Sequence, residues 1–183
     1  MTKKPRTNRQ MTEKELAALG KVVVSSAKFE SKLDWVLPLM MKVSDDVYPS
    51  VIAGRTIGPK VALYSAVLNA KLTAIRNIKR KRSWMAHVKN VLKAMNDAVQ
   101  KRNVVVHGLW SPGGEGDSLW VLFHPEFSEA PIAAASKKGH LKVSAGELAA
   151  LATTFDELSE SVAGAYWEFF VPRARKKKAT RGK

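Results

Sequence analysis

The sequence predicts a mainly α-helical fold: an antiparallel bundle of four to five helices with a small β-hairpin or flap inserted before the last helix. Apolar residues recur every three or four positions through four long segments of the 183-residue chain, which is the period of an amphipathic helix. After Gly108 the chain changes to turn-forming residues and short apolar runs rich in β-branched and aromatic side chains, a combination typical of strands. Long helices with short connections pack as a bundle.

The first helix is expected to begin at a capping box. The Thr12 hydroxyl would accept a hydrogen bond from the Glu15 backbone, and the Glu15 carboxylate would accept one from the Thr12 backbone. Six apolar residues then follow the helical spacing: Leu19, Val22, Phe29, Leu33, Val36 and Met40. Proline lacks an N–H group and clashes with the preceding turn, so Pro38 is expected to kink or end this helix.

The second helix is expected after a connection over residues 44–58, where Asp, Pro and Gly interrupt the pattern. Pro59 suits the first turn, because its fixed φ matches a helix. The buried face of this helix is predicted to carry Val61, Tyr64, Leu68, Leu72 and Ile75.

The break before the third helix is placed at residues 79–83, because four consecutive like charges disfavour a continuous packed face. The third helix then runs from about Ser83 and ends at Gly108. Its predicted apolar stripe consists of Val88, Leu92, Met95, Val99 and Val106.

The flap is expected over residues 118–143. The run "SLWVLFH" (118–124) would pair with "PIAAA" (131–135) and "HLKV" (140–143) around the turn "SKKG". A second capping box, from Ser144 to Glu147, opens the last helix. Its apolar positions are Leu148, Leu151, Phe155, Leu158, Val162 and Phe169, and Pro172 is expected to end it.

The composition predicts one helical domain, residues 12–171, between two flexible basic arms, residues 1–11 and 172–183. With no cysteine, disulfides, thiolate metal sites and cysteine nucleophiles are excluded. No apolar run is long enough to cross a bilayer, and the basic N-terminus lacks the apolar region of a secretory signal. We therefore expect a cytoplasmic protein without membrane association.

The net charge of +15 is concentrated in clusters. Candidate nucleic-acid-binding residues are Lys79, Arg80, Lys81 and Arg82 in the chain interior and Arg173, Arg175, Lys176, Lys177 and Lys178 in the tail. Binding of a polyphosphate partner to such clusters is favourable, because each neutralised phosphate releases counterions. A solubilising surface or a membrane-surface patch is the alternative. We expect a nucleic-acid partner, RNA in particular.

The segment "KRNVVVHGLW", residues 101–110, contains the candidate catalytic residues. Three- and four-residue steps along the third helix place Arg102 inside the apolar stripe, where an unpaired guanidinium would be costly. It therefore needs a partner, either a buried carboxylate or a bound phosphate. Asn103 and His107 are four residues apart and share a face, whereas Arg102 lies about 140° from His107 around the helix.

Arg102 and Asn103, followed by His107, Gly108 and Trp110, resemble the R-x(4–6)-H motif of the HEPN superfamily. In that family a polar residue commonly follows the arginine, and many members continue as HGxW. The helical layout over roughly residues 12–170 is also similar. Arg82 and His87 share the spacing, but they open a helix and Ser83 follows the arginine, so we assign the motif to Arg102.

The resemblance implies a metal-independent endoribonuclease of the toxin or defence type, which acts as a homodimer and needs no cofactor. His107 would transfer the proton as general base or acid. Arg102 would hold the phosphate and its developing charge, and Asn103 would orient either group. Attack by the RNA 2′-OH would leave a 2′,3′-cyclic phosphate. An antitoxin or another protein is a further expected partner.

Plainer interpretations compete with this one. His107 and Gly108 suit a helix end, with Gly108 as a left-handed cap. Trp84, Trp110 and Trp120 are expected to serve packing more than base stacking, and His87, His124 and His140 lack metal-ligand spacing. Glu13, Glu15 and Glu30 show no paired-carboxylate arrangement. The alternative functions are a catalytically silent basic module that binds nucleic acid or protein, and a purely structural helical protein.

Overall fold

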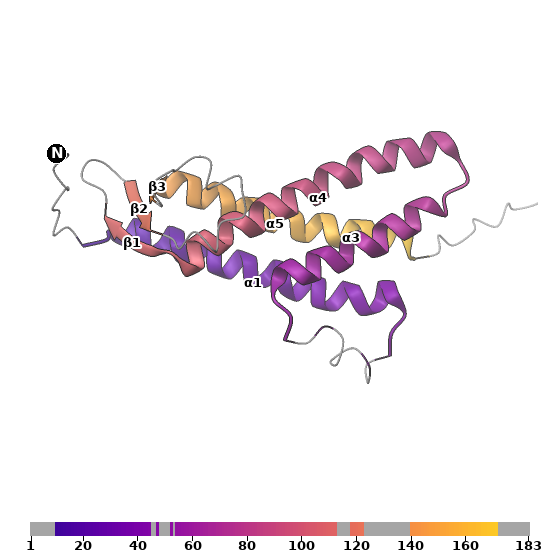
Figure 1. Cartoon of the computed structure of the whole chain (residues 1–183), viewed down its shortest axis with the longest axis horizontal. Helices are drawn as coiled ribbons and strands as arrows, with labels where there is room; N and C mark the ends of the chain where they lie inside the picture. Colours follow the sequence, from indigo (N-terminus) through magenta and orange to yellow (C-terminus); the bar gives the residue numbers. More distant parts are fainter. Residues whose placement is uncertain are drawn as a thin grey trace, which may run out of the picture.

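The computed structural model of the chain describes residues 10–44, 47, 52, 54–112, 118–122 and 140–171. Four helices pack as a bundle, with three short strands at one end (Figure 1). The predicted mainly α fold with a small β insertion before the last helix is confirmed. The helices are α1 (Glu13–Met41), α3 (Ile57–Thr73), α4 (Ile78–His107) and α5 (Ala145–Phe169), and the strands are β1 (Leu109–Pro112), β2 (Ser118–Leu122) and β3 (His140–Ser144).

α4 is antiparallel to α1, α3 and α5, which are parallel to one another (Figure 1). In α1 and α5, Phe29 packs on Phe155 and Trp35 on Tyr166, each pair with ring centroids 5.7 Å apart. The two helices therefore advance in the same direction. α3 shares this direction, because Lys71 near its C-terminus lies 4.9 Å above the Phe170 ring at the end of α5. The antiparallel arrangement expected from the sequence thus applies to α4 alone.

Both predicted capping boxes are present, and they open the two most closely packed helices. The Glu15 backbone N–H donates to the Thr12 hydroxyl at 3.3 Å, while the Thr12 N–H donates to the Glu15 carboxylate at 2.7 Å. The same pair of bonds joins Ser144 to Glu147, and the bonds from Ser144 lower the pKa of the Glu147 carboxyl. α1 continues past Pro38 to Met41, where Lys42 adopts the left-handed conformation with φ of 56°.

The core lies between α1, α3 and α5 and includes the largest fully buried side chains, Tyr64, Phe29 and Phe155. The predicted apolar faces of these helices are confirmed in most positions. The residues at these positions that are buried are Val22, Phe29, Leu33, Val36, Met40, Val61, Tyr64, Leu68, Leu72, Leu148, Leu151, Phe155, Leu158 and Val162. Leu19, Ile75 and Phe169 are partly buried and pack against this core.

A buried lysine fixes the start of α3 against the middle of α1. The Lys60 ammonium lies 2.9 Å from both the Glu30 and the Asp34 carboxylates, which are one helical turn apart. The sequence did not indicate this cluster, because only the folded chain brings the cation of α3 to Glu30 and Asp34. Burial by itself would lower the pKa of Lys60, but the two hydrogen bonds and the negative charges outweigh it and raise the pKa above 10.5.

The break between the second and third helices lies earlier than predicted, at residues 74–77. The Asn77 side chain caps α4 by accepting a hydrogen bond from the Arg80 N–H at 2.9 Å. Placing the break at residues 79–83 was wrong, because these basic side chains point mostly to solvent and need no packed face. Residues 79–82 form the first turn of α4.

The strands form an antiparallel sheet in the order β1-β2-β3, with Trp110 opposite Val121 and Val121 opposite Leu141. The predicted pairing of β2 with β3 is confirmed, whereas β1 was not predicted and begins directly after Gly108. The "PIAAA" segment, residues 131–135, lies outside the described residues. Val121 is fully buried and packs with Val104 at the end of α4, so the sheet covers one side of the last helical turn.

Replacing Lys60 with methionine, which keeps the aliphatic stem, is expected to lower the free energy of unfolding by about 1–3 kcal/mol at neutral pH, because two partly exposed carboxylates lose their cation. The pKa of Lys60 is raised in the folded state, so its charge stabilises fully below the unfolded pKa and loses this effect as pH rises through the folded value. Urea unfolding should show a constant difference at pH 7–9 that shrinks above about pH 10.5.

The matched control is Lys21→Met, which removes an exposed lysine of α1. It should change the unfolding free energy by less than about 0.5 kcal/mol. A Lys60→Met protein as stable as the wild type at neutral pH would contradict the role given to this lysine.

Candidate functional site at the end of α4

The last turn of α4 leads directly into β1. The Gly108 N–H closes the helix by donating to the Val104 carbonyl at 2.9 Å, but Gly108 itself is extended, with φ of −77° and ψ of 148°. The expected left-handed glycine cap is therefore wrong, because pairing of Leu109 with Leu122 continues the chain as a strand. The Trp110 indole donates to the Val105 carbonyl at 2.8 Å, which satisfies one of the carbonyls left open at a helix end.

The side of α4 that is buried changes near the end of the helix. In the middle of the helix the buried residues include Met95 and Val99, as predicted, but in the last turn they are Val104 and Val105. Val106, expected on the buried stripe, is 38% exposed. The cause is the sheet, which packs on the Val104 side of the last turn. On the other sides of that turn Val106 and His107 are exposed, Asn103 is half-exposed and Arg102 is partly buried.

Arg102 is partly buried, and none of the carboxylates in the described part of the chain pairs with it. Its guanidinium Nη1 donates to the Asn103 side-chain oxygen at 3.3 Å. Its Nε is buried and has no hydrogen-bond partner among the described residues, and none of the ion pairs in this part of the chain includes Arg102. A buried donor without an acceptor costs about 1–3 kcal/mol. The side chain therefore has unused hydrogen-bonding capacity beside Asn103.

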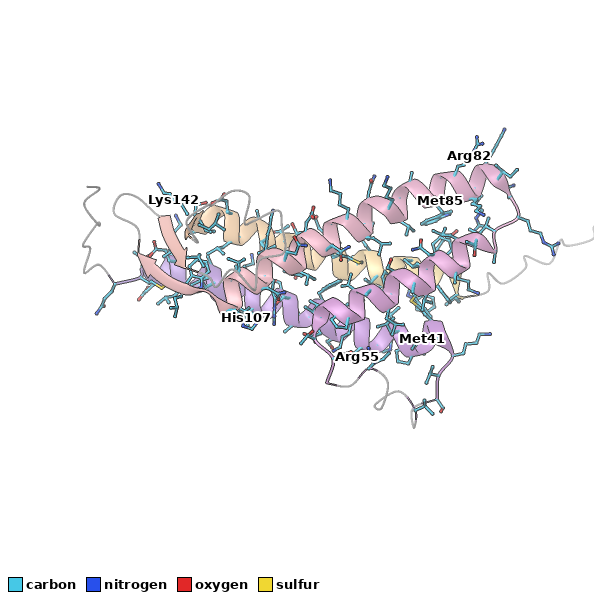
Figure 2. The ribbon with its side chains drawn as sticks, viewed as in Figure 1. Met41, Arg55, Arg82, Met85, His107 and Lys142 are labelled. Atoms are coloured by element: carbon cyan, nitrogen blue, oxygen red, sulfur yellow. The ribbon has the colours of Figure 1, made fainter. Side chains whose placement is uncertain are left out.

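Of the three motif residues, the structure brings Arg102 and Asn103 into contact and places His107 separately. His107 is exposed at the end of α4, where the helix meets the sheet (Figure 2). Asn103, half-exposed, lies between Arg102 and His107 around the helix, at about 40° from His107 and 100° from Arg102. The arrangement offers a guanidinium, an amide and an imidazole around one turn, with the guanidinium partly buried and the imidazole exposed.

The predicted basic cluster, residues 79–82, lies at the other end of α4. Arg82 precedes Arg102 by twenty positions, or roughly 30 Å at 1.5 Å per residue. Arg80 pairs with Glu168 at 2.8 Å, and the Lys81 ammonium lies 3.5 Å from the Thr73 carbonyl. The tail residues Arg173, Arg175, Lys176, Lys177 and Lys178 lie outside the described residues.

The other aromatic and histidine candidates have structural surroundings where the structure describes them. Trp84 packs edge-on against Phe169 with centroids 4.5 Å apart, and His87 packs edge-on against Trp84 at 5.5 Å. Packing was the expected role of Trp84 and Trp110. Across the described ranges, no three histidine, aspartate or glutamate side chains gather as metal ligands would.

A cleft of about 580 Å³, which the sequence did not predict, lies between α4, β3 and α5. Its walls are mainly apolar, with Val104 and Leu148 facing Leu141, and its charged lining includes Lys101 and Glu147. Neither Arg102 nor His107 lines it. Residue spacing carries no signal for this cleft, because its third wall depends on where β3 packs.

Comparison with known proteins found no matching family model, curated protein or solved structure. None of the helices described combines the length and the apolar character that a membrane span requires.

Replacing Arg102 with methionine tests whether this arginine serves folding. Methionine keeps the apolar stem and removes the buried, unpartnered Nε, so the free energy of unfolding is expected to stay equal or rise by about 1 kcal/mol. Arg80→Met, which removes an arginine that does hold a carboxylate, should lose up to about 1 kcal/mol. A loss larger than that in Arg102→Met, measured by urea unfolding, would assign Arg102 a structural partner.

Proposed function

We propose that the protein is a cytoplasmic, metal-independent endoribonuclease of the HEPN type, acting in a toxin or defence system. The observation that carries the proposal is the partly buried Arg102, which contacts Asn103 and has no carboxylate partner among the described residues. A phosphate would supply the missing acceptors. His107 is exposed on the same turn, and the helix that carries these residues is strongly basic.

The chemistry needs a proton acceptor, a proton donor and a stabilising charge. RNA carries its own nucleophile, the 2′-OH, which attacks the adjacent phosphorus as His107 accepts its proton. The bond from phosphorus to the 5′ oxygen breaks, and that oxygen takes a proton from the His107 imidazolium, leaving a 2′,3′-cyclic phosphate and a 5′-hydroxyl. Arg102 stabilises the charge that develops on the phosphoryl oxygens. Asn103, already bonded to Arg102, holds the guanidinium in place.

A homodimer is part of this proposal, because the resemblance to HEPN proteins implies one and a surface is open for it. This dimer would not bring the two α4 ends together, since its surface lies on the side of α5 opposite the face that meets α4. An open groove between α1 and α5 offers a surface for a second copy; Val24 and Trp35 line it and are 54% and 47% exposed. A two-fold axis parallel to these helices would set α1 of each copy against α5 of the other.

The charges along this groove suit such an axis. Lys28 and Lys32 lie on its α1 side, and Asp156 and Glu160 lie on its α5 side. Because α1 and α5 advance together, the axis would place the lysines of one copy opposite the carboxylates of the other at matching heights. An antitoxin or another protein is the alternative occupant.

A catalytically silent module that binds nucleic acid is the second candidate. The separation of Arg102 from His107 within one chain favours it, as does the placement of the basic cluster at the far end of α4. The two candidates differ in whether bound RNA is cut.

Cleavage of total RNA in excess EDTA is expected for the wild type and should fall at least about 100-fold in His107→Ala and in Arg102→Met, the usual size of a lost proton-transfer or charge-stabilising group. His87→Gln, a histidine of α4 that packs on Trp84, is the matched control and should cut normally. Gel analysis of the products and their terminal phosphates gives the readout. Cutting that survives both site changes would place the activity elsewhere.

Sedimentation analysis should show a wild-type dimer and a monomeric Val24→Glu variant, because a carboxylate in the apolar part of the α1–α5 groove would be desolvated on association. Val24 is half-exposed in the single chain, so folding should be unaffected. Met85→Glu alters a similarly exposed apolar residue of α4 and should remain dimeric. A monomeric wild type would contradict the dimer.

A further inference from the structure

A polar stripe runs along the outer side of α4, with one exposed apolar residue, Met85, at its edge. At 100° per residue, its members fall within an arc of about 80° over nearly the whole helix. The first part is cationic and consists of Arg82, Lys89 and Lys93. The second part carries side-chain amides and ends at His107. The amide residues are Asn96, Gln100 and Asn103.

Burial shows that this stripe stays open from end to end. The three cationic residues, Asn96 and His107 are exposed, and Gln100 and Asn103 are half-exposed. The helix carries eight lysines and arginines against one acidic residue, Asp97. Asp97 lines the cleft towards α5, so no carboxylate of α4 interrupts the stripe. A surface of cations and hydrogen-bonding amides without a carboxylate suits a polyanion.

We propose that this α4 stripe is a track for the backbone of single-stranded RNA, leading the strand from the basic cluster to His107. This inference rests on the proposed function and extends it to the substrate path. Arg82, Lys89 and Lys93 would contact phosphates, and the amides would donate hydrogen bonds to phosphate or base edges. The one tryptophan of α4, Trp84, packs on Phe169, so recognition through phosphates and amides is largely independent of sequence.

The geometry of the stripe sets the length and the end point of the bound strand. From Arg82 to His107 the helix rises roughly 38 Å, which matches about eleven stacked nucleotides at ~3.4 Å each. A strand on this path reaches Asn103 and His107 last. Asn103 also accepts a hydrogen bond from Arg102. The end of the track therefore lies next to the Arg102 guanidinium.

The test is binding of a 2′-O-methylated RNA of about 12 nucleotides, slightly longer than the track, to the full chain by fluorescence anisotropy at several salt concentrations. This RNA lacks the nucleophilic hydroxyl, so binding is measured without cleavage. Lys89→Gln with Lys93→Gln is expected to bind roughly 25-fold more weakly at 0.1 M salt and to lower the salt slope by about 1.4, since each single-strand phosphate contact contributes about 0.7.

Lys21→Gln with Lys42→Gln is the control, which removes two exposed lysines, one in α1 and one at its C-cap, and the same total charge. Equal weakening in both double variants would overturn the track, because attraction would then follow net charge alone. Unchanged binding in the Lys89/Lys93 variant, or tighter binding of a DNA strand of the same length, would also overturn it. If unmodified RNA also binds through the stripe but is never cut, the proposed ribonuclease is refuted and the track is supported.

Discussion

The position of Lys60 between Glu30 and Asp34 sets where α3 lies along α1, and so which parts of the other helices α3 can cover. A buried ammonium with two carboxylates 2.9 Å away allows little axial sliding of α3 along α1. α3 starts beside the middle of α1 and advances in the same direction. It therefore packs only in the half of the bundle away from the sheet (Figure 1). The C-terminal half of α4, next to the sheet, is covered by α5 and the sheet instead, and His107 in its last turn is exposed.

That last turn is where the chemistry-bearing residues gather. The sheet buries Val104, and the core buries Val105. Asn103 and His107 therefore face outward, and Arg102 lies partly buried beside them. One helix thus serves three purposes along its length. Its start carries the basic cluster, its middle packs through Met95 and Val99, and its end presents the candidate site.

Local signals in the sequence predicted most of the fold, whereas the assignment of Arg102, Asn103 and His107 as site residues stays a prediction. The capping boxes at Thr12 and Ser144 and the apolar repeats of α1 and α5 depend on neighbouring residues, so they could be recognised without a structure. The start of α4 was misplaced because charge was weighed above the Asn77 cap. The direction of α3, the shift of Val106 to the surface and the cleft beside β3 depend on contacts between distant segments, which spacing does not encode.

The arrangement of three helices against one has an electrostatic consequence for the basic end of the bundle. Peptide dipoles give a helix N-terminus partial positive charge and a C-terminus partial negative charge, so four cations in the first turn of α4 are unfavourably placed within their own helix. The C-termini of α3 and α5 lie at the same end (Figure 1). Lys81 reaches the Thr73 carbonyl and Arg80 the carboxylate of Glu168. The neighbouring helices thus offset the repulsion, and the cluster can keep its charge facing outward.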